Sequence, residues 1–377
     1  MSAPIVQGWC PGAHRPMMSG DGLVVRVRPR LARLSRNQAL GLCALADRFG
    51  NGTIDLTNRA NLQLRGVDPG DHAALLQALT DLDLLDAEPG IETRRNILIT
   101  PLYQPGDMAA RLARQLTSRL GDLPDLPAKF GFAIDTGPAR LLARDSADIR
   151  LEQGADDRLI LRADGAATGQ PVTEIEAIPR LIDLARWFAQ TRGPDTRRMA
   201  RLVAVRDLPA DWQGTAPANM APPLAPGDAA PGPIYGAPFG QLPAGALADL
   251  LTHSGARALR VTPWRLFLAE GGRPLQSDIF VSTPGDPLLT TDACPGAPYC
   301  PQAQAETRAI ARALAPRVTG SLHVSGCAKG CARQGPADVT LVGHEGRFDL
   351  VKSGRAGDEP CQRGLDPETL MTLTDFT

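Results

Sequence analysis

Hydrophobic and polar positions at the start of the chain follow the pattern of an α+β unit. Residues 22–28 alternate and are rich in valine, which indicates a strand. Ser35 and Gln38 form a capping-box pattern before an apolar-faced helix, which the turn at residues 50–52 ends. The pattern further predicts strands at 53–56 and 62–64 and a helix over 71–85 that begins at Asp71. Residues 1–90 are therefore expected to form one α+β half-unit.

Residues 91–212 have the pattern of a separate α/β unit. The predicted elements are strands at 97–99 and 130–134, helices at 108–120 and 175–190, and a hairpin of 148–151 with 158–161. Residues 213–234 are rich in Gly, Ala and Pro and lack periodicity, which is typical of a linker.

A weak internal repeat follows this linker. Residues 242–253 predict a helix and residues 258–268 a strand, so that residues 235–275 form a shorter second half-unit. Within the repeat, residues 54–59 align with residues 259–264. Residues 276–377 are then expected to form a second α/β unit.

The composition excludes several classes of protein. The chain has 377 residues, enough for two or three domains, and its formal net charge of −1 gives no basic field for nucleic acid or an anionic membrane. No apolar run reaches the roughly 18 residues of a spanning helix, and the N-terminus lacks the regions of a signal peptide. We therefore expect a cytoplasmic protein whose cysteines stay reduced.

Two closely spaced cysteine pairs carry the strongest chemical signal. Five residues separate Cys294 from Cys300, and three separate Cys327 from Cys331. Four thiolates in two such pairs suit an iron–sulfur cluster. Structural zinc is one alternative, although paired zinc ligands favour about two to four intervening residues, and unrelated thiols are another. The odd total of seven cysteines argues against a disulfide framework.

The cysteine spacing resembles the cluster motif of the siroheme-dependent sulfite and nitrite reductases. The resemblance implies that all four cysteines hold a 4Fe–4S cluster, and that Cys331 matches the cysteine that also touches the tetrapyrrole iron. It also implies a sulfite/nitrite reductase-like fold of the α+β and α/β classes. In that fold, two pseudo-symmetric ferredoxin-like half-units form one domain, and two α/β domains bind the cluster and the tetrapyrrole.

Cationic and amide residues occur where that family binds tetrapyrrole carboxylates. The matching stretches are an Arg-x-Arg strand at 26–28, a Thr-x-Arg-x-x-x-Gln strand at 57–63, an Arg-Asn pair at 95–96 and a Leu-Pro-x-Lys loop at 126–129. Guanidinium and ammonium groups are suited to binding carboxylates. The resemblance implies catalytic roles for Arg95 and Lys129. The predicted tetrapyrrole-binding set comprises Arg26, Arg28, Arg59, Asn61, Gln63, Arg95, Asn96, Lys129 and Lys329.

Two departures from the reductases point to a different branch. Gly131 stands where the reductases carry a lysine or an asparagine, so that one donor to a small oxyanion is missing and more room is left. Ala328 and Lys329 replace a Pro-Asn pair and add a positive charge beside the cluster motif. Together with residues 10–23 and 341–343, this segment resembles the precorrin-3B synthases of aerobic cobalamin biosynthesis.

That second resemblance implies an iron–sulfur monooxygenase. Precorrin-3A would be hydroxylated at C20 with O2 and closed to a γ-lactone, which gives precorrin-3B. Electrons would come from NADH through a reductase or ferredoxin partner, because the chain has no Gly-x-Gly-x-x-Gly fingerprint. One alternative is a sulfite or nitrite reductase that binds siroheme. Another is a non-enzymatic electron carrier or tetrapyrrole-binding protein.

The sequence leaves the oxygen-activating centre open. A mononuclear non-haem iron commonly takes two histidines and a carboxylate. The five histidines are His14, His72, His253, His323 and His344. Each is more simply explained as a hydrogen-bonded loop, surface or core residue than as a ligand. The other cysteines are interpreted as bystanders, and these are Cys10, Cys43 and Cys361.

Overall fold

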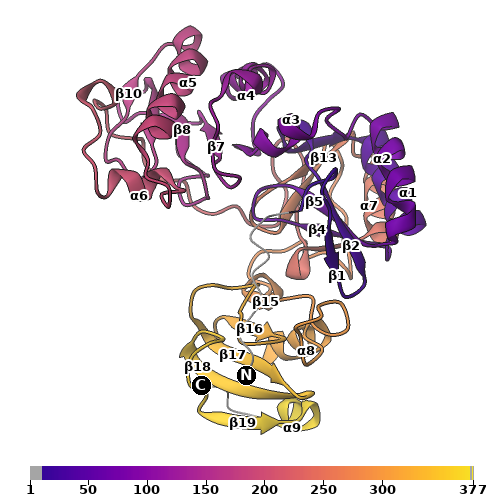
Figure 1. Ribbon diagram of the computed structural model, residues 1–377. Helices are drawn as coiled ribbons and strands as arrows, with labels where there is room; N and C mark the ends of the chain where they lie inside the picture. Colours follow the sequence, from indigo (N-terminus) through magenta and orange to yellow (C-terminus); the bar gives the residue numbers. More distant parts are fainter. Residues whose placement is uncertain (1–10, 374–375, 377) are drawn as a thin grey trace.

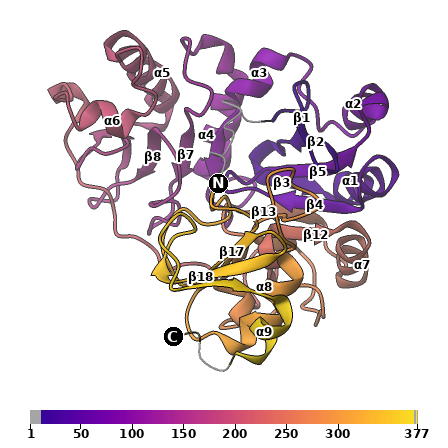
Figure 2. The same cartoon turned by 60° about the horizontal axis from the view of Figure 1, so that its bottom comes forward.

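The computed structural model describes residues 11–373 and residue 376, so Cys10 lies outside the described residues. The chain forms three lobes (Figure 1). One contains both half-units, one contains the α/β unit between them in sequence, and the third is the C-terminal α/β unit. Turning the molecule brings the C-terminal lobe in front of the junction of the other two (Figure 2).

Two antiparallel sheets build the lobe of the half-units. The first has the order β1 (Met17–Ser19), β2 (Gly22–Val27), β5 (Leu62–Val67), β4 (Thr53–Leu56) and β12 (Gln241–Pro243). The second has the order β11 (Ile234–Gly236), β14 (Leu266–Glu270), β13 (Ala258–Val261) and β3 (Arg33–Ser35). Strand β12 thus completes the sheet of the first half-unit, and β3 completes that of the second. Because each sheet borrows an edge strand, the two half-units depend on each other.

Three helices pack beside these sheets, namely α1 (Arg36–Phe49), α2 (His72–Asp81) and α7 (Ala244–Ser254), with the short α3 (Pro89–Arg94) nearby. The predicted capping box is confirmed, since Ser35 accepts from the Gln38 N–H and the Gln38 side chain accepts from the Ser35 N–H. The helix predicted over 71–85 ends earlier than expected, since α2 stops at Asp81. Asp71 makes no side-chain cap, whereas Asp68 caps the preceding turn.

The expected strand at 258–268 is wrong, because the chain turns back between β13 and β14 and forms a hairpin. The turn repeats the one between β4 and β5. Thr57 accepts hydrogen bonds from the N–H groups of Arg59 and Asn61, and Thr262 accepts one from the N–H of Trp264. The predicted repeat therefore includes the turns, and Trp264 is the counterpart of Arg59.

Each α/β unit has one five-stranded sheet. The first has the order β10 (Gln170–Pro171), β9 (Leu159–Ala163), β8 (Ile149–Gln153), β7 (Phe132–Asp135) and β6 (Ile97–Ile99). The second has the order β15 (Thr291–Ala293), β16 (Leu322–Ser325), β17 (Ala337–His344), β18 (Arg347–Gly354) and β19 (Gln362–Leu365). In both sheets, the first three strands in sequence pair in parallel, and the fourth and fifth strands each pair antiparallel with the strand before them. The internal repeat thus extends to these units.

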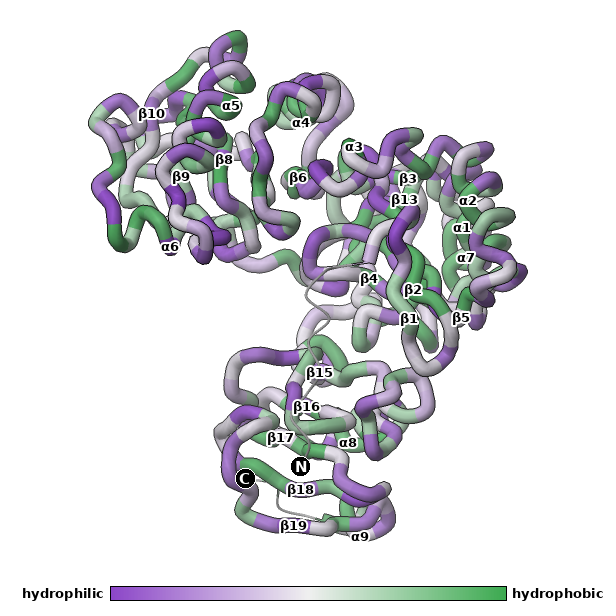
Figure 3. The backbone as a smooth tube through the Cα atoms, in the orientation of Figure 1, coloured by the Kyte–Doolittle hydropathy of each residue, from purple (hydrophilic) through white to green (hydrophobic). Residues whose placement is uncertain are grey.

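The remaining helices are α4 (Met108–Ser118), α5 (Glu174–Thr191), α6 (Met199–Val203), α8 (Arg308–Leu314) and α9 (Pro367–Thr372). One hydrophobic core runs through both half-units and the first α/β unit, and another fills the C-terminal unit. Hydrophobic residues follow the inner strands and the neighbouring helices α1 and α7 (Figure 3). Within the described part of the chain, every helix is too short or too polar to cross a membrane.

Candidate functional site

The four predicted cluster cysteines follow two neighbouring parallel strands. Cys294 comes directly after β15, and Cys327 comes two residues after β16. These strands pair in parallel, with Ala293 opposite Val324, so their carboxyl ends meet at one edge of the sheet. A crossover through α8 therefore brings together two cysteine pairs that lie far apart in the sequence.

Glycines let the two cysteine loops approach closely. The Gly326 N–H donates to Sγ of Cys294 over 3.2 Å. A Cβ added to Gly326 would lie 2.7 Å from Cβ of Ala303, and one added to Gly296 would lie 2.6 Å from Oγ1 of Thr307. Gly296 also has φ of 71°, a conformation that favours glycine. The loop backbones are therefore closely packed, and one backbone N–H reaches the sulfur of Cys294.

The pKa of the Cys331 thiol depends on its burial and on the charged groups around it. Burial raises the pKa of the Cys331 thiol, the charge of Lys329 lowers it, and the thiols of Cys294, Cys327 and Cys300 raise it further. Among the described residues, no three His, Cys, Asp or Glu side chains are grouped as for a single metal ion. A cubane cluster holds its cysteines around four iron atoms, so its ligands stand farther apart. The four cysteines at this sheet edge are the residues that could hold such a cluster.

A buried histidine lies beside the second cysteine loop. His323 is fully buried on β16, and neither ring nitrogen has a hydrogen-bond partner among the described residues. A Cβ added to Gly330 would lie 3.6 Å from its Cε1 atom. Burial lowers the pKa of His323 to about 4, so the ring is neutral near pH 7. A buried nitrogen without a hydrogen-bond partner costs free energy of folding. The ring of His323 could therefore gain a partner from a group enclosed by the second cysteine loop.

The first cysteine loop is fastened to the first half-unit. The carbonyl of Tyr299 accepts hydrogen bonds from the Gly20 N–H, the Ser19 hydroxyl and Nη2 of Arg65, at 3.2, 2.8 and 3.2 Å. Arg65 is buried and also pairs with Asp21. This carbonyl fixes the position of the Cys294–Cys300 loop against β1, the turn after it, and β5.

A second cluster of predicted residues lies where the first half-unit meets the first α/β unit. Nη2 of Arg59 donates to the Lys129 carbonyl over 2.9 Å and to the Ser146 hydroxyl over 3.4 Å. Lys129 is exposed. A Cβ added to Gly131 would lie 3.6 Å from Nη1 of Arg59 and 3.2 Å from the Asn96 carbonyl. A longer side chain at position 131 would therefore enter the space beside Arg59.

Sequence reasoning missed Arg198 at this cluster. Its Nη2 also donates to the Ser146 hydroxyl, over 3.1 Å, while its Nε binds the fully buried Asp148 carboxylate over 2.9 Å. Arg59 and Arg198 thus share one hydroxyl. The adjacent arginines at 197 and 198 were the only signal in the sequence, and nothing there indicates that Arg198 reaches the hydroxyl that Arg59 also binds.

Two predicted ligands do not occupy the open positions expected of them. Arg28 pairs with Glu92 at 2.6 Å, and Arg95 pairs with Asp86 through two bonds of 3.0 and 2.7 Å. Both arginines are buried, and burial lowers the pKa of Arg28 to about 10. With Asn61 they border a cavity of only about 20 Å³, too small for a tetrapyrrole. Their guanidinium groups are engaged in holding the fold together.

The other predicted residues are placed as follows. Asn96 donates to the carbonyls of Thr93, Ala128 and Phe130, so its amide shapes the loop that presents Lys129. Arg26 and Gln63 are opposite each other on β2 and β5, on the same face as Asp55. Lys329 is half-buried in the second cysteine loop.

The histidines do not form the two-histidine, one-carboxylate site considered for a mononuclear iron. His14 contacts the Asp86 carbonyl, His72 the Ala13 carbonyl and His253 the Asp249 carbonyl. His344 is exposed at the end of β17. No two of these histidines belong to a ligand group with a carboxylate among the described residues.

Comparison with known proteins places this arrangement in the sulfite/nitrite reductase-like class. The family model of the nitrite/sulfite reductase ferredoxin-like half domain matches residues 15–82. The fold resembles the solved structure of the Mycobacterium tuberculosis NirA protein, with a TM-score of 0.66 and 19% identity, over 93% of this chain and 79% of that one. The predicted fold class is thereby confirmed.

Two curated proteins define the branch. The chain is 30% identical to a ferredoxin–nitrite reductase of Synechococcus elongatus, but only over 33% of this chain and 26% of that protein. It is 34% identical to a precorrin-3B synthase of a Sinorhizobium species, over 95% of this chain and 85% of the relative. The chain therefore belongs to the precorrin-3B synthase family and is an enzyme of that type.

Proposed function

We propose that this enzyme converts precorrin-3A to precorrin-3B in aerobic cobalamin biosynthesis. One atom of O2 enters the C20 hydroxyl group and the other leaves as water, which consumes two electrons and two protons. The ring-A acetate then closes the γ-lactone without a further change of oxidation state. The observation that carries the proposal is the cationic cluster beside Gly131, which keeps carboxylate-binding groups while omitting a donor to small oxyanions.

The residues of this chain have separate tasks in that reaction. Arg59 and Lys129 bind peripheral carboxylates of the substrate, and Arg198 holds the loop that supports Arg59. Gly131 leaves room for the meso edge of the macrocycle. The four cysteines at the ends of β15 and β16 would hold a 4Fe–4S cluster, which supplies electrons one at a time when it is bound. Electrons from NADH would arrive through a reductase or ferredoxin partner.

Purification without oxygen gives the first test. A broad absorption shoulder that dithionite bleaches, without extractable haem, supports the cluster. Replacing Cys294 with Ser should abolish this shoulder, whereas replacing the bystander Cys361 with Ser should preserve it. A Soret band with an extractable siroheme would contradict the proposal and favour a sulfite or nitrite reductase.

The reaction itself is tested with precorrin-3A, reduced ferredoxin and isotopically labelled O2. The product should gain one labelled oxygen atom, and product formation should stop in the absence of O2. Incorporation of label from water instead of O2 would refute the monooxygenase. Tetrapyrrole binding without any turnover, under every electron donor supplied, would favour a non-enzymatic binding protein.

A further inference from the structure

The first α/β unit has an apolar cavity at the position that the cysteine loops occupy in the C-terminal unit. Thr100 follows β6 directly and donates its N–H to the Ile134 carbonyl on β7. Cys294 follows β15 and donates to the Val324 carbonyl on β16 in the same way. A cavity of about 560 Å³ opens at this edge and is bordered by Thr100 and by Thr136, which follows β7.

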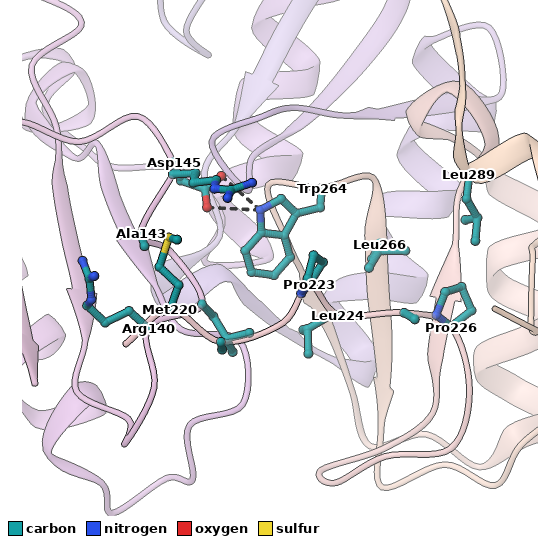
Figure 4. A pocket seen from close by; sticks show the side chains of 14 residues that line it. Arg140, Ala143, Asp145, Met220, Pro223, Leu224, Pro226, Trp264, Leu266 and Leu289 are labelled. Carbon is teal, nitrogen blue, oxygen red and sulfur yellow. Dashed lines mark hydrogen bonds between the residues drawn. The ribbon is translucent and has the colours of Figure 1, made fainter. Parts of the chain in front are cut away.

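A second cavity, of about 440 Å³, adjoins the first and shares Leu141, Ala221 and Leu224 with it. Figure 4 shows its walls, where Trp264 from the second half-unit faces the linker and the loop that contains Asp145. The indole N–H of Trp264 donates to both carboxylate oxygens of Asp145 over 3.1 Å.

The internal repeat relates this wall to the candidate tetrapyrrole site. Trp264 is the counterpart of Arg59, and the two side chains reach consecutive residues of one loop, Asp145 and Ser146. Two residues after Trp264 the change is in the same direction, because Leu266 stands where the first half-unit has Asn61, whereas Arg265 between them replaces Ala60 and pairs with Asp292 outside the cavity lining. One repeat therefore offers cations and amides, whereas the other offers an aromatic and aliphatic surface.

The charges around the second cavity are few. The carboxylate of Asp145 is engaged by Trp264, and Arg140 binds the Ala218 carbonyl and Glu152. Arg144 is exposed at the border, and no ion-pair or hydrogen-bond partner is found for it within residues 11–373. Concave apolar sites of this size, with a few polar groups, are typical of small-molecule binding.

We propose that the two adjoining cavities form a second small-molecule site for a flat, largely apolar molecule with one anionic group. Trp264 stacks on the ligand, and Arg144 binds its anionic group. The site is distinct from the cluster of Arg59 and Lys129, none of whose predicted residues borders either cavity. The proposal does not depend on the reaction proposed above.

Two fluorescent probes of similar shape test the site on the full-length protein, namely anionic anilinonaphthalene sulfonate and neutral N-phenylnaphthylamine. Both should bind saturably with one site per chain. Arg144→Gln should weaken the anionic probe by roughly two- to five-fold and leave the neutral probe unchanged. Arg206→Gln, at an exposed arginine outside the cavities, is the matched control and should change neither.

Two further variants separate loss of the site from loss of the fold. Trp264→Ala should weaken both probes by at least roughly five-fold, and Trp264→Phe should restore most of the binding. Ala221→Trp, which fills the shared wall, should block both probes while the circular dichroism spectrum stays unchanged. Binding that survives Ala221→Trp, or an equal effect of Arg144→Gln and Arg206→Gln, would overturn the proposal.

Competition then distinguishes this site from the tetrapyrrole site. Uroporphyrin, a macrocycle with eight carboxylates, should leave the affinity of both probes unchanged. Competitive displacement by uroporphyrin would mean that the cavities belong to the tetrapyrrole site, and the proposal of a second site would fail even if precorrin-3A turnover is found.

Discussion

Replacing Arg95 with Ala should damage the fold before it affects substrate binding. The sequence resemblance assigns Arg95 to the tetrapyrrole, but its guanidinium group donates twice to Asp86 and once to the Arg28 carbonyl, at 3.0, 2.7 and 2.7 Å. The substitution would leave the Asp86 carboxylate buried without its cation. Removal of one partner from a buried ion pair costs about 3–5 kcal/mol of unfolding free energy.

A matched control sets the scale of that loss. Arg119 and Asp122 form a pair of the same chemistry at 2.8 Å, but both side chains are more than 40% exposed. Arg119→Ala should therefore cost at most about 1 kcal/mol. The double change of Arg95→Leu with Asp86→Leu should recover part of the stability lost in Arg95→Leu, because no charge is then left buried.

The assay is urea unfolding followed by circular dichroism, with tetrapyrrole affinity measured on the same samples. Hydrogen exchange across residues 84–100 reports whether the loss is local. The structural role would be refuted if Arg95→Ala unfolded like Arg119→Ala and yet bound tetrapyrrole at least ten-fold more weakly. Arg95 would then be a substrate ligand in the working enzyme.

Three further predictions concern other parts of the molecule. Arg65→Lys should speed the oxygen-dependent bleaching of the cluster and lower stability by about 1.5–3 kcal/mol, because the shorter lysine side chain cannot keep the guanidinium bonds to both the Tyr299 carbonyl and Asp21; unchanged bleaching would contradict this. Lys129→Gln should raise the KM for precorrin-3A roughly two- to five-fold without changing the unfolding curve, and Lys352→Gln should leave both unchanged. Burial raises the pKa of Glu270, but hydrogen bonds from Arg33 and Arg260 outweigh burial and lower the pKa to about 2. The ionised Glu270 should therefore stabilise the folded protein above pH 4.5, and this stabilisation should be lost as the pH falls toward 2. Glu270→Gln should be less stable at pH 7 and match the parent near pH 2, and a difference that stays constant with pH would exclude this account.

Local patterns predicted the elements of the fold well where one short-range interaction decides them. The capping box at Ser35 starts α1 as expected, and β8 and β9 form the hairpin predicted for 148–151 with 158–161, each strand extending two residues further. The prediction of a single strand over 258–268 was wrong because the hydrophobic pattern does not show where the chain turns. Apolar residues continue on both sides of the turn at Thr262, and the turn is closed by bonds from the Thr262 hydroxyl and N–H to the Leu266 carbonyl and from the Trp264 N–H to the Thr262 hydroxyl.

The site was less accessible to sequence reasoning than the fold. Cysteine spacing selected four thiols that the parallel strands β15 and β16 bring to one sheet edge. A motif does not reveal which arginine already has a buried partner, since Asp86 lies nine residues before Arg95 and Glu92 lies 64 residues after Arg28. The position of Arg198 also depends on tertiary structure, because the buried carboxylate of Asp148 holds it from 50 residues away.

The exchange of strands β3 and β12 explains how one duplicated framework can carry two unlike sites. Each half-unit completes the other's sheet, so substitutions in the core of either half-unit affect both. The turns after β4 and β13 lie outside these shared sheets and can change independently. Arg59 and Trp264 occupy those turns and contact adjacent residues of the same loop. A change in the loop at 145–146 should therefore affect both sites, whereas a change at either turn should affect only one.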